Sequence, residues 1–322
     1  MRTMTMNMKK LITDAVLGLA TGDALGVPAE FYNREERKAD PVTGMRGGGY
    51  HNQKPGTWSD DTSMALALMD SLTRRGFDTE DQMRCYVDWL WSGKYTARGE
   101  VFDVGGTTSR TIERFASGTP ADACGETGEN TCGNGSLMRV MPMALYLYGR
   151  GQGELNDETA AMIHRSSAVT HAHPRCQMAC GVYCAVAFRL CRGEKAREAV
   201  ANGVKDALAY YKDKTEFAGV YGDFTSLTTI GTWPEQMVQS GGYALHTLQA
   251  ALWCLLTTDS YAECVLQAVN LGRDTDTTAT VAGGLAGLLY GEESIPNEWL
   301  AVLARRDDIR QMCSDMAAAL EK

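Results

Sequence analysis

The chain has 322 residues, of which 44% are hydrophobic and 22% are charged, a composition typical of a soluble globular enzyme rather than of a disordered or fibrous chain. Its formal net charge of −9 at pH 7 argues against a nucleic-acid binder or a membrane-surface binder, because both need a basic field. A small anionic ligand held by backbone amides remains compatible with this charge.

The N-terminal stretch "MRTMTMNMKKLITDAVLGLATGDALG" carries basic residues before an apolar segment, which raises the possibility of a signal peptide. Asp14 and Asp23 interrupt the apolar segment, and no small-residue cleavage site follows cleanly. No segment approaches the roughly 18 consecutive apolar residues of a membrane span. We therefore expect the first helix of a cytoplasmic protein that does not enter a membrane.

Apolar residues recur at helical spacing along most of the rest of the chain, and alternating strand patterns are missing. Several segments start with Asp, Ser or Thr and stop at Gly, as capped helices do. Further helices are predicted at residues 60–76, 81–93, 176–193, 196–213, 241–256, 260–272 and 297–322. The pattern predicts an all-α protein, and the absence of linkers or repeats favours one domain over residues 1–322.

Glycine is frequent, with 34 residues, and glycine-rich loops are expected at 44–56, 99–106, 124–135, 217–223 and 239–242. Together with the Ala-rich helices, this predicts close helix packing with several helices buried on all sides.

Three of the ten cysteines, at 176, 180 and 184, recur every four residues on one helical face. The simpler interpretation is a packed face of buried free cysteines. A zinc site with His171 and His173 is the alternative, but it lacks a CxxC pair and is set aside.

Two acidic stretches stand directly before apolar helices: "SDDT" at 59–62 and "DTDT" at 274–277. Taken singly, each is best explained as a helix cap. Taken together they supply four carboxylates, which would repel one another strongly if they lay close, unless a cation lay between them. Such oxygen ligands suit Mg²⁺ or Mn²⁺. Spatial proximity is not visible in a sequence, so both explanations stay open.

Further polar residues stand near predicted helix ends. Asp23 is expected to be structural, capping or bonding to backbone near Gly22, and Glu30 either reaches a cleft or is a surface carboxylate. The loops beginning at Gly105 and Gly133 both look like helix starts suited to phosphate, although plain tight turns are commoner. Neither loop matches a Walker or Rossmann fingerprint.

Six segments occur in a fixed order: "GLATGDALGVPAEF", "WSDDTSMAL", "FDVGGTT", "GNGSLMR", "SGGYALHTLQAALWCLL" and "LGRDTDTTATVAGGLAGLLYG". Together they closely resemble the ADP-ribosylglycohydrolase family, of the dinitrogenase-reductase-activating glycohydrolase and ADP-ribosylarginine hydrolase type. The resemblance runs from about residue 10 to residue 291.

The resemblance implies an all-α fold with two Mg²⁺ or Mn²⁺ ions in a cleft formed at helix N-termini. The metal ligands it implies are Ser59, Asp60, Asp61, Asp274, Asp276 and Thr277. Catalytic roles fall to Glu30, which would assist the water, to Asp103, which would transfer a proton, and to Asp61. Substrate-binding positions are Gly105, Gly106, Gly133, Asn134, Gly135 and Ser136 near the pyrophosphate, with His171 and Tyr243 on the adenosine side or at the mouth of the cleft.

The implied activity is hydrolysis of the N-glycosidic bond between ADP-ribose and a protein side chain, most often arginine, with ADP-ribose as product. Two alternatives stay open. One is hydrolysis of O-linked ADP-ribose, on serine or in O-acetyl-ADP-ribose. The other is an immunity protein that neutralises an ADP-ribosylating toxin by occluding it.

Overall fold

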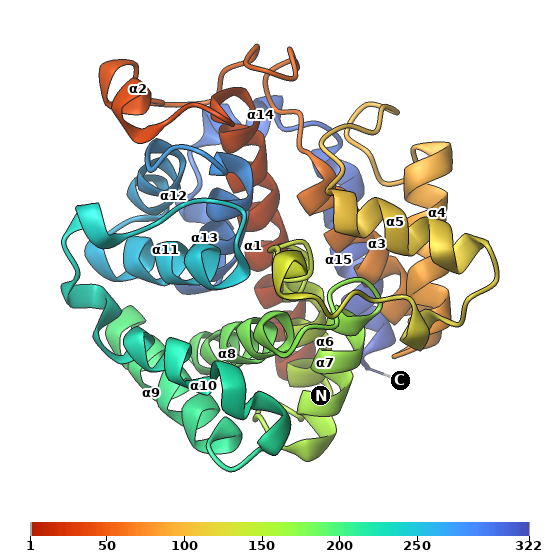
Figure 1. Cartoon of the computed structure of the whole chain (residues 1–322). Helices are drawn as coiled ribbons and strands as arrows, with labels where there is room; N and C mark the ends of the chain where they lie inside the picture. The colour runs from red at the N-terminus through yellow and green to blue at the C-terminus, as the bar shows by residue number, and fades with distance from the viewer. Residues whose placement is uncertain (1, 322) are drawn as a thin grey trace.

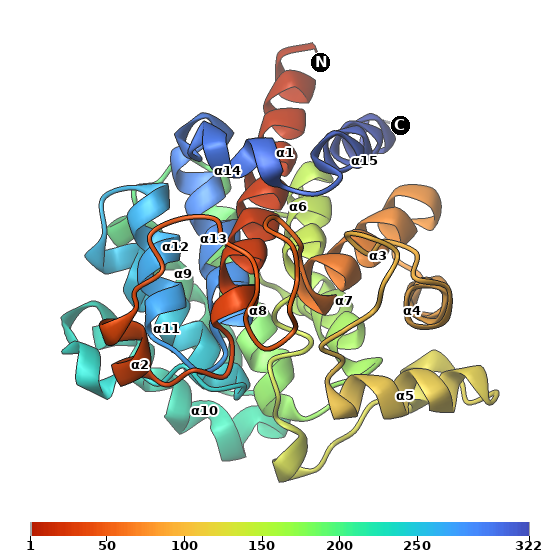
Figure 2. The ribbon, with the colours of Figure 1, turned by 90° about the horizontal axis from the view of Figure 1, so that it is seen from above.

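The computed structural model describes residues 2–321, and within this range it contains fifteen α-helices, several short 3₁₀ turns and no β-strand. The all-α prediction is confirmed. Figure 1 shows the helices gathered around α1 (Arg2–Gly26), which runs through the middle of the molecule. Seen from above in Figure 2, α1 lies beside α13 (Thr275–Tyr290), with both chain ends on the same side.

The pair formed by α1 and α13 is the centre of the fold, and the contact between these two helices is the most extensive in the described protein. The helices that pack against this pair are α3 (Asp60–Arg75), α6 (Met141–Gly149), α8 (Pro174–Cys191), α11 (Ala244–Thr257), α12 (Tyr261–Asn270) and α15 (Arg306–Ala319). A second shell consists of α4 (Thr79–Ser92), α5 (Gly106–Ala116), α7 (Asp157–Ala168) and α9 (Ala196–Tyr211). The short helices are α2 (Arg34–Ala39), α10 (Ala218–Phe224) and α14 (Asn297–Val302).

Glycines set the distance between α1 and α13. Gly18, Gly22 and Gly26 are spaced by four residues and therefore lie on one face of α1. A Cβ atom at Gly22 would overlap the carbonyl oxygen of Ala279, and one at Gly26 would overlap the backbone of Asp276. The two backbones touch because these side chains are absent, as the glycine content predicted.

The apolar character of α1 also has a structural explanation. By length and hydropathy, Met8–Ala29 would suffice to cross a membrane, so the sequence-based statement that no segment approaches such a span was too strict. The apolar window of this segment is completely buried inside the protein. Its hydropathy is that of a core helix with neighbours on every side.

All ten cysteines are free and buried, and the cysteine face of α8 packs into the core as predicted. Two other predictions are wrong. The expected glycine-rich loop at 217–223 contains α10 instead, because glycine lowers helix propensity without forbidding a helix. The expected helix at 297–322 is two helices, α14 and α15.

The break between α14 and α15 has a tertiary cause. Arg305 adopts a left-handed backbone conformation, with φ of 48°, which ends a right-handed helix. The Ala304 amide donates to the carbonyl of Gly56, and the Arg305 guanidinium donates to the carbonyl of Thr96. These partners come from distant loops, so the local helical pattern of the sequence contained no signal for the break.

We expect Gly22→Ala to lower the free energy of unfolding by about 1–3 kcal/mol or more, because the new methyl group forces α1 away from α13. Gly222→Ala in α10 is the matched control: its Cβ would meet no atom within 4 Å, so stability should stay equal or rise by up to about 1 kcal/mol. Urea unfolding of both variants checks this. Equal stability of the two variants would contradict the packing argument.

Candidate functional site

The N-termini of α3 and α13 meet, and this brings the two acidic stretches of the sequence together. Ser59 caps α3 by accepting a hydrogen bond from the Asp61 amide at 3.3 Å. Asp274 stands at the N-cap position of α13, with Asp276 in its first turn. The Thr277 hydroxyl lies 3.4 Å from Oδ1 of Asp61 and so links the two helix starts. The proximity on which a metal site depends is therefore present.

Asp23, near the end of α1, holds the start of α3 in place. Its carboxylate accepts hydrogen bonds from the amides of Ser59 and Thr62, at 2.9 and 3.0 Å, and from the Thr62 hydroxyl at 2.6 Å. Its role is structural, as expected, but its partners lie in α3 and not near Gly22. Burial raises the pKa of Asp23 to about 6 while these hydrogen bonds oppose the rise.

The opposite wall of the site comes from two loops that pair with each other. The backbone amide of Asn134 donates to the carbonyl of Gly242 at 3.0 Å. The Asn134 side chain donates to Oδ2 of Asp274 at 2.8 Å and to the hydroxyl of Thr247 at 2.9 Å. Asn134 thus fixes the position of Asp274 from a loop that is not part of α13.

Between these elements lies a cavity of about 250 Å³. Twelve of the residues that the sequence singled out line it: Glu30, Asp60, Asp61, Asp103, Gly105, Gly106, Gly133, Asn134, Gly135, His171, Asp274 and Thr277. The other residues that line it, which were not in the predicted site set, are Val104, Thr107, Thr108, Met138 and Gly242. Segments more than 200 residues apart in the chain thus contribute to one cavity.

Four predicted site residues do not line this cavity. Ser59 and Asp276 are buried beside it. The Ser136 hydroxyl accepts a hydrogen bond from Ser167 at 2.8 Å, so the side chain points into the protein. The ring of Tyr243 belongs to a neighbouring cavity.

His51 is a contact residue that the sequence analysis missed. Its Nε2 lies 2.7 Å from Oε2 of Glu30 and 3.6 Å from Oδ1 of Asp103. The imidazole packs against the rings of Phe31, Tyr50 and Phe102, with centroid distances of 5.1–5.7 Å. The only available signal was its place in the glycine-rich loop before "SDDT". His51 therefore holds the two carboxylates at one end of the cavity together.

Burial and mutual repulsion raise the pKa values of the acids around the cavity. Burial raises the pKa of Glu30 to about 10, assisted by the charges of Asp103, Asp274 and Asp60. The pKa values of Asp60, Asp61 and Asp276 are raised well above the usual range, first by burial and then by neighbouring carboxylates. Without a cation, the folded protein therefore favours protonated carboxyl groups here.

The carboxylates have the properties of ligands for a hard cation. Both oxygens of Asp276 and Oδ2 of Asp61 are buried and form no hydrogen bond with the described protein, although buried polar atoms normally have partners. The neighbouring carboxylates and the Thr277 hydroxyl offer further oxygen ligands. Oxygen donors of this kind fit Mg²⁺ or Mn²⁺.

The two glycine loops lie on the same side of the cavity. Gly105 is the N-cap of α5, so the amides of that helix start are available to an anion. The Gly133 loop was also expected at a helix start, but residues 134–139 form turns and α6 begins only at Met141. Burial and the charge of Arg139 lower the pKa of His171 to about 3, so its ring is neutral.

Three of the six non-glycine residues with positive φ in the described chain lie at this site. Phe31, Asp103 and Arg273 are non-glycine residues with φ of 69°, 55° and 68°. Asp103 lines the cavity, while Phe31 directly follows Glu30 and Arg273 directly precedes Asp274. Strained residues of this kind cluster at functional sites. The Phe31 amide donates to the Arg273 carbonyl at 2.7 Å, and the Arg273 amide donates to the Tyr32 carbonyl at 2.6 Å. These bonds hold the segments after Glu30 and before Asp274 against each other.

A second group of potential ligands, Glu129, Cys132 and His173, does not have the properties of a metal site. Nδ1 of His173 caps α8 by accepting a hydrogen bond from the Arg175 amide at 3.1 Å. A neutral ring then carries its proton on Nε2, which faces Glu129 at 3.1 Å. A metal-bound histidine instead donates from its other nitrogen. The group also contacts the Arg175 guanidinium, and we assign it to anchoring α8.

Comparison with known proteins identifies the family of the chain. A family model described as ADP-ribosylglycohydrolase matches residues 4–322. The chain is 33% identical over 313 residues to the ADP-ribosyl-dinitrogen reductase glycohydrolase of Rhodospirillum rubrum, with 95% of each chain covered. It is 30% identical over 306 residues to the ADP-ribosylarginine hydrolase Tri1 of Serratia proteamaculans (strain 568), covering 94% of this chain and 77% of that protein.

A solved structure described as an ADP-ribosylglycohydrolase-related protein complex is also similar. It is 30% identical and covers 97% of this chain and 99% of its own, with a TM-score of 0.75. The chain therefore belongs to the ADP-ribosylglycohydrolase family, as its motifs predicted. The predicted enzyme class, a glycohydrolase of ADP-ribose conjugates, is confirmed by this membership.

We expect the metal-free protein to become less stable as the pH rises from 5.5 to 8. Unfolded carboxyl groups ionise near pH 4, whereas Asp60, Asp61 and Asp276 have raised pKa values when folded. The folded state therefore binds more protons over this range, and its stability is lost as they dissociate. Thermal unfolding in EDTA measures the effect.

Added Mg²⁺ or Mn²⁺ should raise Tm more at pH 8 than at pH 5.5, because cations replace the protons. Asp276→Asn should flatten the pH dependence in EDTA. A Tm that is independent of both pH and divalent cations would contradict the assignment of these carboxylates.

Proposed function

We propose that this protein is a metal-dependent hydrolase that removes ADP-ribose from arginine side chains of proteins by cleaving the N-glycosidic bond. The observation that carries the proposal is the pairing of two aspartate-bearing helix starts under one cavity, with unpartnered buried carboxylate oxygens. The names of the two bacterial relatives, one of them an ADP-ribosylarginine hydrolase, support the choice of substrate.

Two Mg²⁺ or Mn²⁺ ions would be held by Ser59, Asp60, Asp61, Asp274, Asp276 and Thr277. When bound, such ions polarise hydroxyl oxygens and water and neutralise the buried acids. The Ser59 hydroxyl also caps α3. A hydroxyl oxygen has a second lone pair, so the cap does not prevent ligation.

The chain's own residues would carry out the proton transfers. Glu30, ionised once cations occupy the site, would accept a proton from the water whose oxygen bonds to C1″. Asp103 would deliver a proton to the leaving guanidine nitrogen as the C1″–N bond breaks. Positive charge develops at the anomeric carbon in such a reaction, and the nearby carboxylates stabilise it. His51, which contacts both acids, would keep them oriented toward the bond.

The remaining lining would hold the rest of ADP-ribose. The amides at the start of α5, with Gly105 and Gly106, and the loop of Gly133 and Gly135 would bind the pyrophosphate. A neutral His171 donates or accepts a hydrogen bond there without adding charge.

We further propose that the chain acts as a single domain in the cytoplasm.

The direct test is release of free ADP-ribose from an arginine-ADP-ribosylated protein in the presence of Mg²⁺, Mn²⁺ or EDTA. We expect release with at least one metal and none with EDTA. Asp60→Ala and Asp276→Ala should each abolish turnover, by about a thousandfold or more, while circular dichroism still shows the helical fold. Full activity in either variant would rule out the ligand assignment.

The same assay separates the alternatives. If ADP-ribose is released from serine or O-acetyl conjugates and not from arginine, the assignment of the site stands and the hydrolysed bond is an O-linked one. An equally tight complex of an ADP-ribosylating toxin with the wild type and with Asp60→Ala would indicate an occluding role instead.

His51→Ala is expected to lower kcat about ten- to a hundredfold with little change in KM, because Glu30 and Asp103 lose their common partner. His51→Gln, whose side-chain amide can still reach Glu30, should restore a large part of kcat. Steady-state kinetics on the arginine conjugate measures both variants. An unchanged kcat in His51→Ala would show that the contact is not used in turnover.

A further inference from the structure

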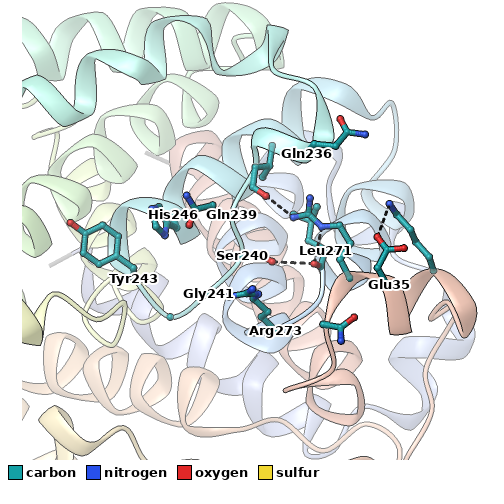
Figure 3. Close-up of a pocket in the computed structure, with 14 residues that line it drawn as sticks. Glu35, Gln236, Gln239, Ser240, Gly241, Tyr243, His246, Leu271 and Arg273 are labelled. Atoms are coloured by element: carbon teal, nitrogen blue, oxygen red, sulfur yellow. Dashed lines mark hydrogen bonds and ion pairs between the residues drawn. The ribbon is translucent and has the colours of Figure 1, made fainter.

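A second cavity, of about 710 Å³, lies beside the site on the other side of the 240–243 loop. Its lining comes from α2, from the loop before α11 and from the turn before α13. Figure 3 shows this lining extending from Tyr243 at one end to Glu35 at the other, with Gly241 and Arg273 between them. The proposed reaction gives this cavity no role.

The second cavity adjoins the proposed active site. Gly242 lines both cavities. Arg273, which lines the second cavity, immediately precedes Asp274 of the first. Arg273 is also hydrogen-bonded through its backbone to the segment Phe31–Tyr32, directly after Glu30. The second cavity thus adjoins the end of the site where the bond to the protein side chain would be broken.

One cation in this cavity has no partner in the described protein. The Arg34 guanidinium is fully engaged, because it donates to the carbonyls of Leu271, Glu235 and Val238. Lys38 lies 3.5 Å from carboxylate oxygens of both Glu35 and Glu235. Arg273 is exposed, and its side chain forms no hydrogen bond or ion pair with the side chains and backbone described for residues 8–321. In a chain of net charge −9, this cation creates a local site for an anion.

The neutral groups of the cavity suit a peptide. Gln236 and Gln239 are exposed, and their side-chain amides form no hydrogen bond with the part of the chain that the structure describes. A side-chain amide both donates and accepts hydrogen bonds, which matches the alternating groups of a peptide backbone. His246 adds a ring whose pKa burial lowers, so it contributes no charge at neutral pH.

We infer that the second cavity binds the segment of the protein substrate that flanks the modified side chain, and that Arg273 pairs with an Asp or Glu of that segment. The inference rests on the proposed function for the reaction in the adjoining site. Because Arg273 directly precedes Asp274 of that site, the acidic residue would lie close in sequence to the modified one, where an extended chain covers 3.3–3.6 Å per residue. Arg273 would therefore be a specificity residue rather than a catalytic one.

The test compares two labelled ADP-ribosylarginine peptides that differ only in carrying Glu or Gln two residues from the modified arginine. For the wild type we expect kcat/KM to be about fivefold higher for the Glu peptide, the effect of one partly exposed ion pair. In Arg273→Gln this ratio should fall to about one. Arg273→Glu should reverse the preference in favour of a peptide carrying Lys at the same position.

Arg75→Gln is the matched control, because Arg75 is also an exposed arginine whose side chain has no partner among residues 8–321. It lies at the far end of α3, about 24 Å along the helix from the site. This variant should keep the fivefold ratio. A ratio that Arg273→Gln leaves unchanged, or that Arg75→Gln also abolishes, would overturn the inference.

Peptide binding measured in EDTA tests the inference separately from the hydrolysis reaction. Fluorescence anisotropy should give the Glu peptide an about fivefold lower Kd than the Gln peptide, and Arg273→Gln should remove the difference. If this holds but no peptide releases ADP-ribose with metal, the proposed function fails while the cavity assignment stands. If Arg273→Gln weakens binding of free ADP-ribose by the same factor, the cavity holds nucleotide and the inference is wrong.

Discussion

The backbone contact between α1 and α13 is the constraint on which the rest of the structure depends. Because Gly26 has no side chain, the end of α1 lies directly against the backbone of Asp276. Thr275 adds a hydrogen bond from its hydroxyl to the Gly26 carbonyl at 2.8 Å. Asp23, one turn earlier, caps α3. A single helix end therefore sets the positions of both acidic helix starts.

The aspartates at the starts of α3 and α13 repel one another when they are ionised. Two like charges about 4 Å apart repel by about 4 kcal/mol at the effective dielectric constant of a protein surface. A helix N-terminus stabilises a nearby carboxylate by only about 0.3–1 kcal/mol. Helix capping does not explain why several acids lie in one place, and this is the reason why we propose divalent cations there. The capping explanation is correct for Ser59 and Asp23, which do cap α3, and insufficient for Asp60, Asp61 and Asp276.

The second cavity extends this argument from chemistry to specificity. The strained turn at Arg273 places a cation immediately next to an aspartate of the proposed metal site. A free arginine beside a group of acids would weaken cation binding if it pointed among them. Because the Arg273 side chain is exposed at the neighbouring cavity, the proposed metal site stays acidic and one positive charge lies outside it. The same two-residue segment would thus contribute to both catalysis and recognition.

The sequence by itself determined the helical class, the buried cysteine face and the acidic stretches, because periodicity and residue type are local properties of the chain. It also identified most residues that line the 250 Å³ cavity. Tertiary structure alone decided which groups meet. The contact of His51 with Glu30, the inward turn of Ser136 and the helix break at Arg305 all depend on partners from distant segments. Burial, which raises the pKa values of the acids, likewise exists only once the helices have packed.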